Sequence, residues 1–80
     1  MSQEQFLDHA FGARLTEERD RLSLAIHELA HLAGITDYKQ KRFENGSSVI
    51  PIDYLQALSA RSDVDVLYVI TGAHGRYPQL

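Results

Sequence analysis

The residues best suited to chemistry form one short run, from His27 to His31, which reads HELAH. Two histidines four positions apart lie on the same side of a helix, where their neutral imidazoles can share a zinc ion while Glu28 acts as a general base. This H-E-x-x-H pattern is typical of zinc peptidases. Gly34 and Asp37 continue it, because in the longer pattern a third ligand follows a glycine turn. The first hypothesis is therefore a metal-dependent enzyme.

The length of the chain and the surroundings of the histidines favour a different interpretation. Eighty residues allow one domain, whereas most zinc peptidases need a second body of structure. A zinc site also needs three or four ligands. On a helical projection, His27 and His31 lie opposite the apolar side that includes Ile26 and Leu29, and Asp37 begins the next helix. We expect surface histidines, no metal site, no cofactor and no enzymatic activity, with the zinc peptidase as a remote alternative.

The composition bounds the class of protein and its partners. It is 44% hydrophobic and 24% charged, and no apolar run approaches the roughly 20 residues of a membrane span. The N-terminal segment carries acids where a secretory signal carries basic residues, so we expect a cytoplasmic protein with no membrane partner. The net charge of −3 argues mildly against nucleic acid, but residues 39–42, KQKR, place three positive charges within four positions. A basic stripe on an acidic protein is therefore possible.

Apolar spacing and turn-forming residues divide the chain into five expected helices, and no strand pattern of period two is evident. Ser2 can cap the first helix and Thr36 the third. Pro51 suits the first turn of the fourth helix, and Asp63 can cap the fifth. The apolar stripe of the first helix runs from Leu7 to Leu22, and the other expected helical segments are 25–34, 37–44, 51–60 and 64–71. The sequence therefore predicts an all-α protein with short loops.

The run LAIHELAHLAGITDYKQKRFENG resembles the helix-turn-helix of the lambda-repressor-like, or XRE/Cro, family, whose members commonly read L-S-Q-x-E-L-A-x-x-A-G-V-S-x-x-x-I-x-x-Y-E-N-G. FGARLTEERDRL looks like the family's first helix, and PIDYLQAL with DVDVLYVITG looks like the ending of a phage-associated subgroup. The resemblance implies a five-helix lambda-repressor-like DNA-binding domain at 1–72, with the helix-turn-helix formed by helices 2 and 3, and a short tail at 73–80. In that case Glu28 belongs to the first helix of the helix-turn-helix, as part of its E-L-A signature, and is not a general base. The residues in register are Glu28, Leu29, Ala30, Ala33, Gly34, Ile35, Thr36, Phe43, Glu44, Asn45 and Gly46.

Two departures from the family pattern affect the expected contacts. Many members carry serine and glutamine where this chain has Ala25 and Ile26, so one anchor to the DNA backbone is missing. Gln40 stands where isoleucine or valine is usual, although the phage-associated subgroup shares this glutamine. Its amide weakens the contact between the two helices unless it finds hydrogen-bond partners. By resemblance, Arg19 forms a structural ion pair with Glu44 and fixes the first helix against the third.

If the resemblance holds, the third helix lies in the major groove, with its N-terminal residues at the base edges. Arg42 or Lys41 can bond guanine, and Asp37 can accept from cytosine N4. Tyr38 can meet a thymine methyl or a phosphate. The alternative for this face is a solvated charged surface. With Thr36 and Lys39, which are expected to contact the DNA backbone, the DNA-binding set is Thr36, Asp37, Tyr38, Lys39, Lys41 and Arg42.

The expected fifth helix is apolar on nearly every side, and a monomer of this size cannot bury both faces. We expect a homodimer with Val66, Val69 and Ile70 in the interface and recognition helices roughly 34 Å apart on a palindrome; core packing alone is the alternative. The expected function is a sequence-specific transcriptional regulator that binds double-stranded operator DNA, a repressor of phage or mobile-element type, with a protein regulator possible. The alternative from another class is a helix-turn-helix scaffold that acts as a protein–protein interaction module.

Overall fold

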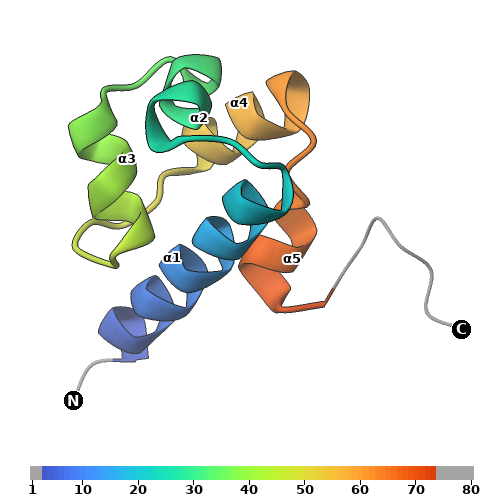
Figure 1. Cartoon of the computed structure of the whole chain (residues 1–80). Coiled ribbons are helices and arrows are strands. Elements are labelled where there is room, and N and C mark those ends of the chain that lie inside the picture. The colour runs from blue at the N-terminus through green and yellow to red at the C-terminus, as the bar shows by residue number, and fades with distance from the viewer. Residues whose placement is uncertain (1–2, 74–80) are drawn as a thin grey trace, which may run out of the picture.

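The computed structural model describes the backbone of residues 3–73 and the side chains of residues 9–73. This part of the chain is helical and contains no strand, which confirms the all-α class. The expected cap at Ser2 and the tail residues 74–80 lie outside the described residues. No helix in the described part is long and apolar enough to cross a membrane. The five helices (Figure 1) are α1 (Gln3–Arg21), α2 (Ile26–Ala33), α3 (Asp37–Glu44), α4 (Ile52–Arg61) and α5 (Val66–Thr71).

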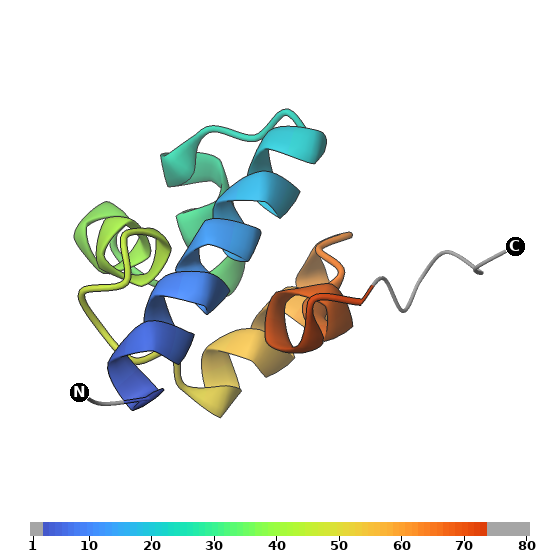
Figure 2. The ribbon, with the colours of Figure 1, turned by 90° about the horizontal axis from the view of Figure 1, so that it is seen from below.

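The long helix α1 lies between two others, because α3 packs on one side of it and α5 on the other (Figure 2). Gly12 permits the contact with α3. A Cβ atom at this position would stand 2.5 Å from the carbonyl oxygen of Phe43, closer than any side-chain carbon can approach a backbone oxygen. Helix α2 contacts α3 and α4. Both α3 and the C-terminal helix are therefore positioned by α1.

The core is built from one apolar side of each helix. The rings of Phe43 and Tyr54 lie with their centroids 4.8 Å apart and join α3 to α4. Ala30 is fully buried, and its small side chain leaves room for neighbouring elements to approach α2 closely. Leu29 and Ala33 lie on the side of α2 that the sequence predicted to face the core. The buried apolar residues are Leu15, Leu29, Ala30, Ala33, Phe43, Tyr54, Leu58, Val64 and Val69.

The turn between α2 and α3 follows the sequence prediction. Gly34 has φ of 75°, in the left-handed region that favours glycine, and its N–H closes α2 on the carbonyls of Ala30 and His31. The Thr36 hydroxyl then accepts a hydrogen bond of 3.1 Å from the N–H of Lys39, which caps α3. The orientation of α3 relative to α2 is therefore set by a three-residue connection.

The start of α5 corrects the sequence prediction. The residue that caps this helix is Asp65, whose carboxylate accepts a 3.0 Å hydrogen bond from the N–H of Tyr68, and Asp63 is not the cap. The physical reason is that Val64 is 1% exposed and enters the core as part of the loop, so that the helix begins two residues later than expected. At α4, Pro51 occupies the N-cap position and not the first turn.

Helix α5 is held on α1 by polar contacts at both of its ends. At its start, the buried carboxylate of Glu18 accepts hydrogen bonds of 2.9 Å from Arg21 and 2.7 Å from the N–H of Asp65. Burial alone would raise the pKa of Glu18, but the hydrogen bonds from Arg21 and from the Asp65 backbone outweigh burial and hold the pKa below its ordinary value. At its end, Arg14 donates to the carbonyls of Val69 and Ile70 at 3.0 and 3.3 Å.

These contacts determine which face of α5 remains at the surface. One of the residues that the sequence placed in the dimer interface, Val69, does not lie on that face. Val69 is 1% exposed, since it packs into the core of its own chain, and so it has no surface to offer a second copy. Val66 is half-buried against the core. The large apolar side chains that α5 exposes are Leu67, at 52%, and Ile70, at 42%.

The buried carboxylate of Glu18 makes the stability of the fold depend on pH. Its pKa in the folded state lies below the ordinary value of 4.5, so its contribution is complete above pH 4.5 and is lost as the pH falls through the folded-state pKa. We expect Glu18→Gln to lower the free energy of unfolding by about 2 kcal/mol at pH 7. Urea unfolding should show a smaller difference between the variant and the wild type at pH 3.5.

The control for this prediction is Asp20→Asn, because Asp20 is exposed and lies 3.6 Å from Arg19 in a surface ion pair. We expect a change below about 1 kcal/mol for this variant. If Glu18→Gln lowers the free energy of unfolding by the same amount at pH 7 and pH 3.5, the role assigned to the carboxylate is wrong.

Candidate nucleic-acid interface

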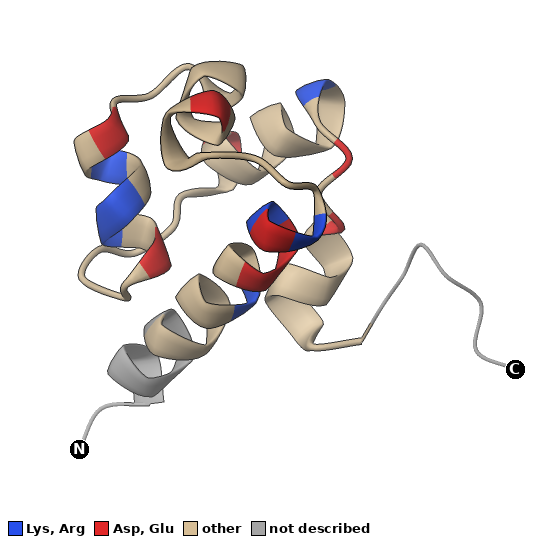
Figure 3. Ribbon diagram, viewed as in Figure 1, with Lys and Arg blue, Asp and Glu red and all other residues tan. Residues whose placement is uncertain are grey.

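Helix α3 has two chemically different sides. Gln40 and Phe43 are buried on its inner side. The cations of the KQKR segment lie on α3, where Figure 3 shows basic segments between acidic ends, while the second half of α1 carries acidic and basic residues together. Arg42, alone among the six predicted DNA-binding residues, is half-buried; the exposed ones are Thr36, Asp37, Tyr38, Lys39 and Lys41.

The inner side of α3 is fixed to α1 through the carboxylate of Glu44. The expected ion pair is present, with Nε of Arg19 2.9 Å from a carboxylate oxygen of Glu44. The Thr16 hydroxyl donates to the same carboxylate at 3.0 Å. Arg19 also donates to the carbonyl of Leu24 at 2.9 Å, so one guanidinium holds both the end of α3 and the loop before α2. The pair is largely withdrawn from water, with side-chain exposures of 15% for Arg19 and 8% for Glu44.

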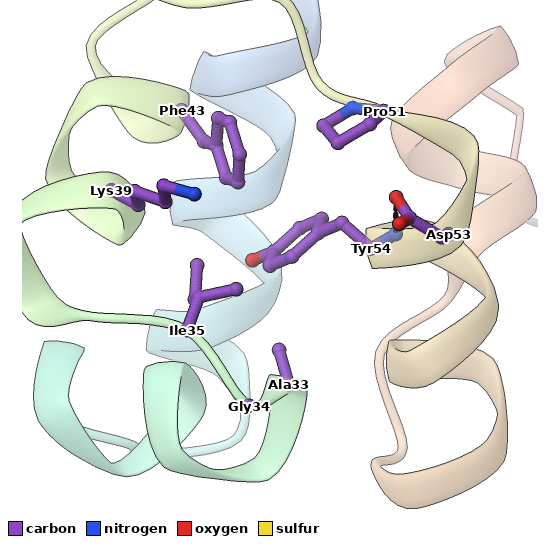
Figure 4. A pocket seen from close by; sticks show the side chains of 8 residues that line it. All are labelled: Ala33, Gly34, Ile35, Lys39, Phe43, Pro51, Asp53 and Tyr54. Atoms are coloured by element: carbon purple, nitrogen blue, oxygen red, sulfur yellow. Dashed lines mark hydrogen bonds between the residues drawn. The ribbon is translucent and has the colours of Figure 1, made fainter.

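Gln40 extends this network to α4. Its side-chain amide donates to Glu44 at 2.7 Å, and its carbonyl oxygen accepts a 2.7 Å hydrogen bond from the hydroxyl of Tyr54. In Figure 4 the Tyr54 hydroxyl points from α4 toward α3. Burial raises the pKa of this hydroxyl well above its usual range, so it stays a donor at any physiological pH. Gln40 is fully buried with its amide satisfied, and the weakening expected from a polar residue at this position is offset by these two bonds.

The sequence prediction assumed that Arg42 points freely outward, but the structure shows its guanidinium bound to the loop after α3. Its Nε donates to the hydroxyl of Ser48 at 2.8 Å and its Nη2 donates to the carbonyl of Ser47 at 3.0 Å. Its guanidinium carbon also lies 5.7 Å from the centre of the Tyr38 ring, within cation–π range. Arg42 thus ties α3 to the loop that follows it. No local rule of the sequence indicated that Ser47 and Ser48 would accept hydrogen bonds from an arginine.

Lys39 lies on a different flank of α3 from Lys41. It lines a hollow of about 220 Å³ between the α2–α3 turn, α3 and the start of α4 (Figure 4), together with Phe43, Pro51, Asp53 and Tyr54. The three cations of α3 are therefore not equivalent: Lys41 is exposed, Arg42 is bound to the following loop, and Lys39 borders this hollow and also shares a second hollow with Arg42.

The HELAH run has a structural role that its letters did not indicate. The carboxylate of Glu28 accepts a 2.7 Å hydrogen bond from the N–H of Ala25 and so caps the start of α2. His27 and His31 are exposed. Asp37, the third ligand that the longer pattern would need, begins α3. Among residues whose side chains the structure describes, no three or more His, Cys, Asp or Glu residues are grouped so that they could hold a metal ion.

Comparison with known proteins adds no functional assignment, since no protein-family model, no curated protein and no solved structure matches the chain.

The buried hydrogen bond between Tyr54 and Gln40 can be tested by mutation. We expect Tyr54→Phe to lower the free energy of unfolding by about 1–3 kcal/mol, because it leaves the carbonyl oxygen of Gln40 buried without a donor. In the background of Gln40→Leu, which removes that oxygen, the same change should cost markedly less. Urea unfolding of the four proteins gives the coupling free energy directly. A coupling near zero would show that the two side chains act independently.

Proposed function

We propose that the protein is a sequence-specific DNA-binding transcriptional regulator of the lambda-repressor-like type, with α2 and α3 as its helix-turn-helix. The observation that carries the proposal is the construction of α3. A short helix is locked on its inner side by a buried ion pair and a buried amide, while its outer side exposes polar, aromatic and cationic groups on a protein of net charge −3. Such rigid support suits a surface that must match the fixed spacing of base edges.

Each outer residue of α3 suits one class of contact. Lys41 can donate to guanine O6 or N7, and Asp37 can accept from cytosine N4. Thr36, at the N-terminus of α3, is suited to a phosphate contact. Lys39 lies on the flank beside the hollow and is suited to the DNA backbone on that side. Arg42 serves the interface by holding the α3–α4 loop against α3.

We also propose that the protein forms a homodimer. Its interface differs from the one expected from the sequence, because Val69 of α5 is buried in its own chain. Apolar residues of α4 and α5 line a shared groove, among them Ile52, Leu55, Val66 and Ile70. Leu67 exposes a further apolar side chain on α5. A second copy packed on this groove would bury these side chains, and a two-fold axis there suits a palindromic operator. Repression of phage or mobile-element genes is the proposed role, with the α4–α5 groove also open to a protein regulator.

The same groove favours one alternative function, that of a protein–protein interaction module. Ile52 is 72% exposed although it is a large apolar residue, and the fold itself gives no reason for this exposure. A module of this kind would use α4 and α5 and would not need Lys41. The two functions are therefore separated by a substitution on α3.

DNA binding can be tested by selecting duplexes from a random-sequence library and measuring Kd for the selected operator over a salt series. We expect affinity to fall steeply with salt and two chains to bind one palindromic duplex. Lys41→Ala should weaken operator binding by about 1–3 kcal/mol and relax the preference for guanine at one position of each half-site.

The matched control is Arg61→Ala, which removes an equal charge from an exposed position at the end of α4. We expect a smaller loss of affinity from this variant and no change in base preference. If no sequence is enriched, or binding at physiological salt stays weaker than about 1 µM, which is the range of nonspecific binding, the DNA-binding proposal is wrong and the interaction module becomes the favoured function.

A further inference from the structure

The outer face of α3 carries an apolar strip that the core does not explain. Tyr38 is 67% exposed and Val49, in the loop after α3, is 70% exposed. Both line one hollow of about 430 Å³ between α3 and that loop, with Phe43 and Pro51 also in its lining. The strip therefore lies beside Thr36 and beside two cations of the KQKR segment, Lys39 and Arg42, which line the same hollow.

The ring of Tyr38 is held in place before any partner binds. Arg42 lies over the ring and its Nη1 is 3.5 Å from the Tyr38 hydroxyl. Arg42 is in turn fixed by its hydrogen bonds to Ser48 and Ser47. The polar tip of Tyr38 thus lies next to a cation, while the residue as a whole stays 67% exposed. A ring fixed in this way loses little conformational entropy on binding.

The chemistry of the major groove limits what this carbon surface can recognise. Phosphates and most base edges present charged or hydrogen-bonding atoms, to which the carbon atoms of a ring cannot hydrogen-bond. The apolar group that a natural base pair presents in the major groove is the C5-methyl of thymine. An exposed ring carbon surface on a helix that lies in this groove is complementary to that methyl group.

We propose that Tyr38 reads a thymine methyl group, and that Arg42 and Ser48 are positioning residues that hold its ring for this contact. The proposal rests on the DNA-binding function proposed above. It assigns an A·T pair to each half-site of the operator, recognised by apolar contact with thymine. Guanine recognition then falls to Lys41, since Arg42 is occupied by the loop.

Replacing single thymines of the selected operator by deoxyuridine tests this contact, because the exchange removes only the methyl group. We expect one position in each half-site where the replacement weakens binding of the wild type about fourfold, the effect of exposing one buried methyl. Tyr38→Phe, which keeps the ring, should show the same loss at the same position. Tyr38→Ala should bind the thymine and deoxyuridine operators equally.

Tyr38 is exposed, so neither variant should change the fold, and measurements at low salt keep the weaker complexes within range. The proposal is overturned if no thymine in the operator gives a loss above about 1.5-fold, well short of one methyl's contribution. It is also overturned if the loss persists unchanged in Tyr38→Ala. In both cases the operator is still bound, and the DNA-binding function stands. Failure to select any operator contradicts both proposals together.

Discussion

The orientation of α3 depends on the need to neutralise one largely buried carboxylate, that of Glu44 at the end of this helix. A carboxylate with a side-chain exposure of 8% is costly unless it is paired and hydrogen-bonded. Arg19 and Thr16 from α1 and Gln40 from α3 supply those partners, and Gln40 is itself held by Tyr54 of α4. Three helices are thus oriented about a single negative charge.

This arrangement separates the two surfaces that the proposed function requires. α3 and α5 lie on opposite sides of α1 (Figure 2), each attached by its own set of polar contacts. Arg19 and Thr16 face α3, whereas Arg14 and Glu18 face α5. A rigid α1 would therefore transmit the geometry of a dimer on the α4–α5 groove to the position of α3. The outer side of α3 is free to vary, because none of the network that holds the helix depends on Tyr38 or Lys41.

The sequence predicted the features that follow local rules and missed those that depend on contacts between distant residues. Thr36 caps α3 and Gly34 ends α2 because capping and left-handed turns are set by a few adjacent residues. Helical periodicity could not show that Val69 packs inward or that Asp65 caps α5, since these depend on how α5 docks against α1. Prediction of the candidate interface was incomplete for the same reason. The sequence placed the residues on and beside α3, but the contacts of Arg42 with the following loop form only in the folded chain.

A titration of the 15N-labelled protein with its selected operator duplex, followed by NMR, tests the central claim most directly, because backbone amide signals report which helix meets the partner. We expect the large changes to fall on residues 36–42 and to reach completion at two chains per duplex. Changes confined to α4 and α5, or none at all at low salt, would contradict it.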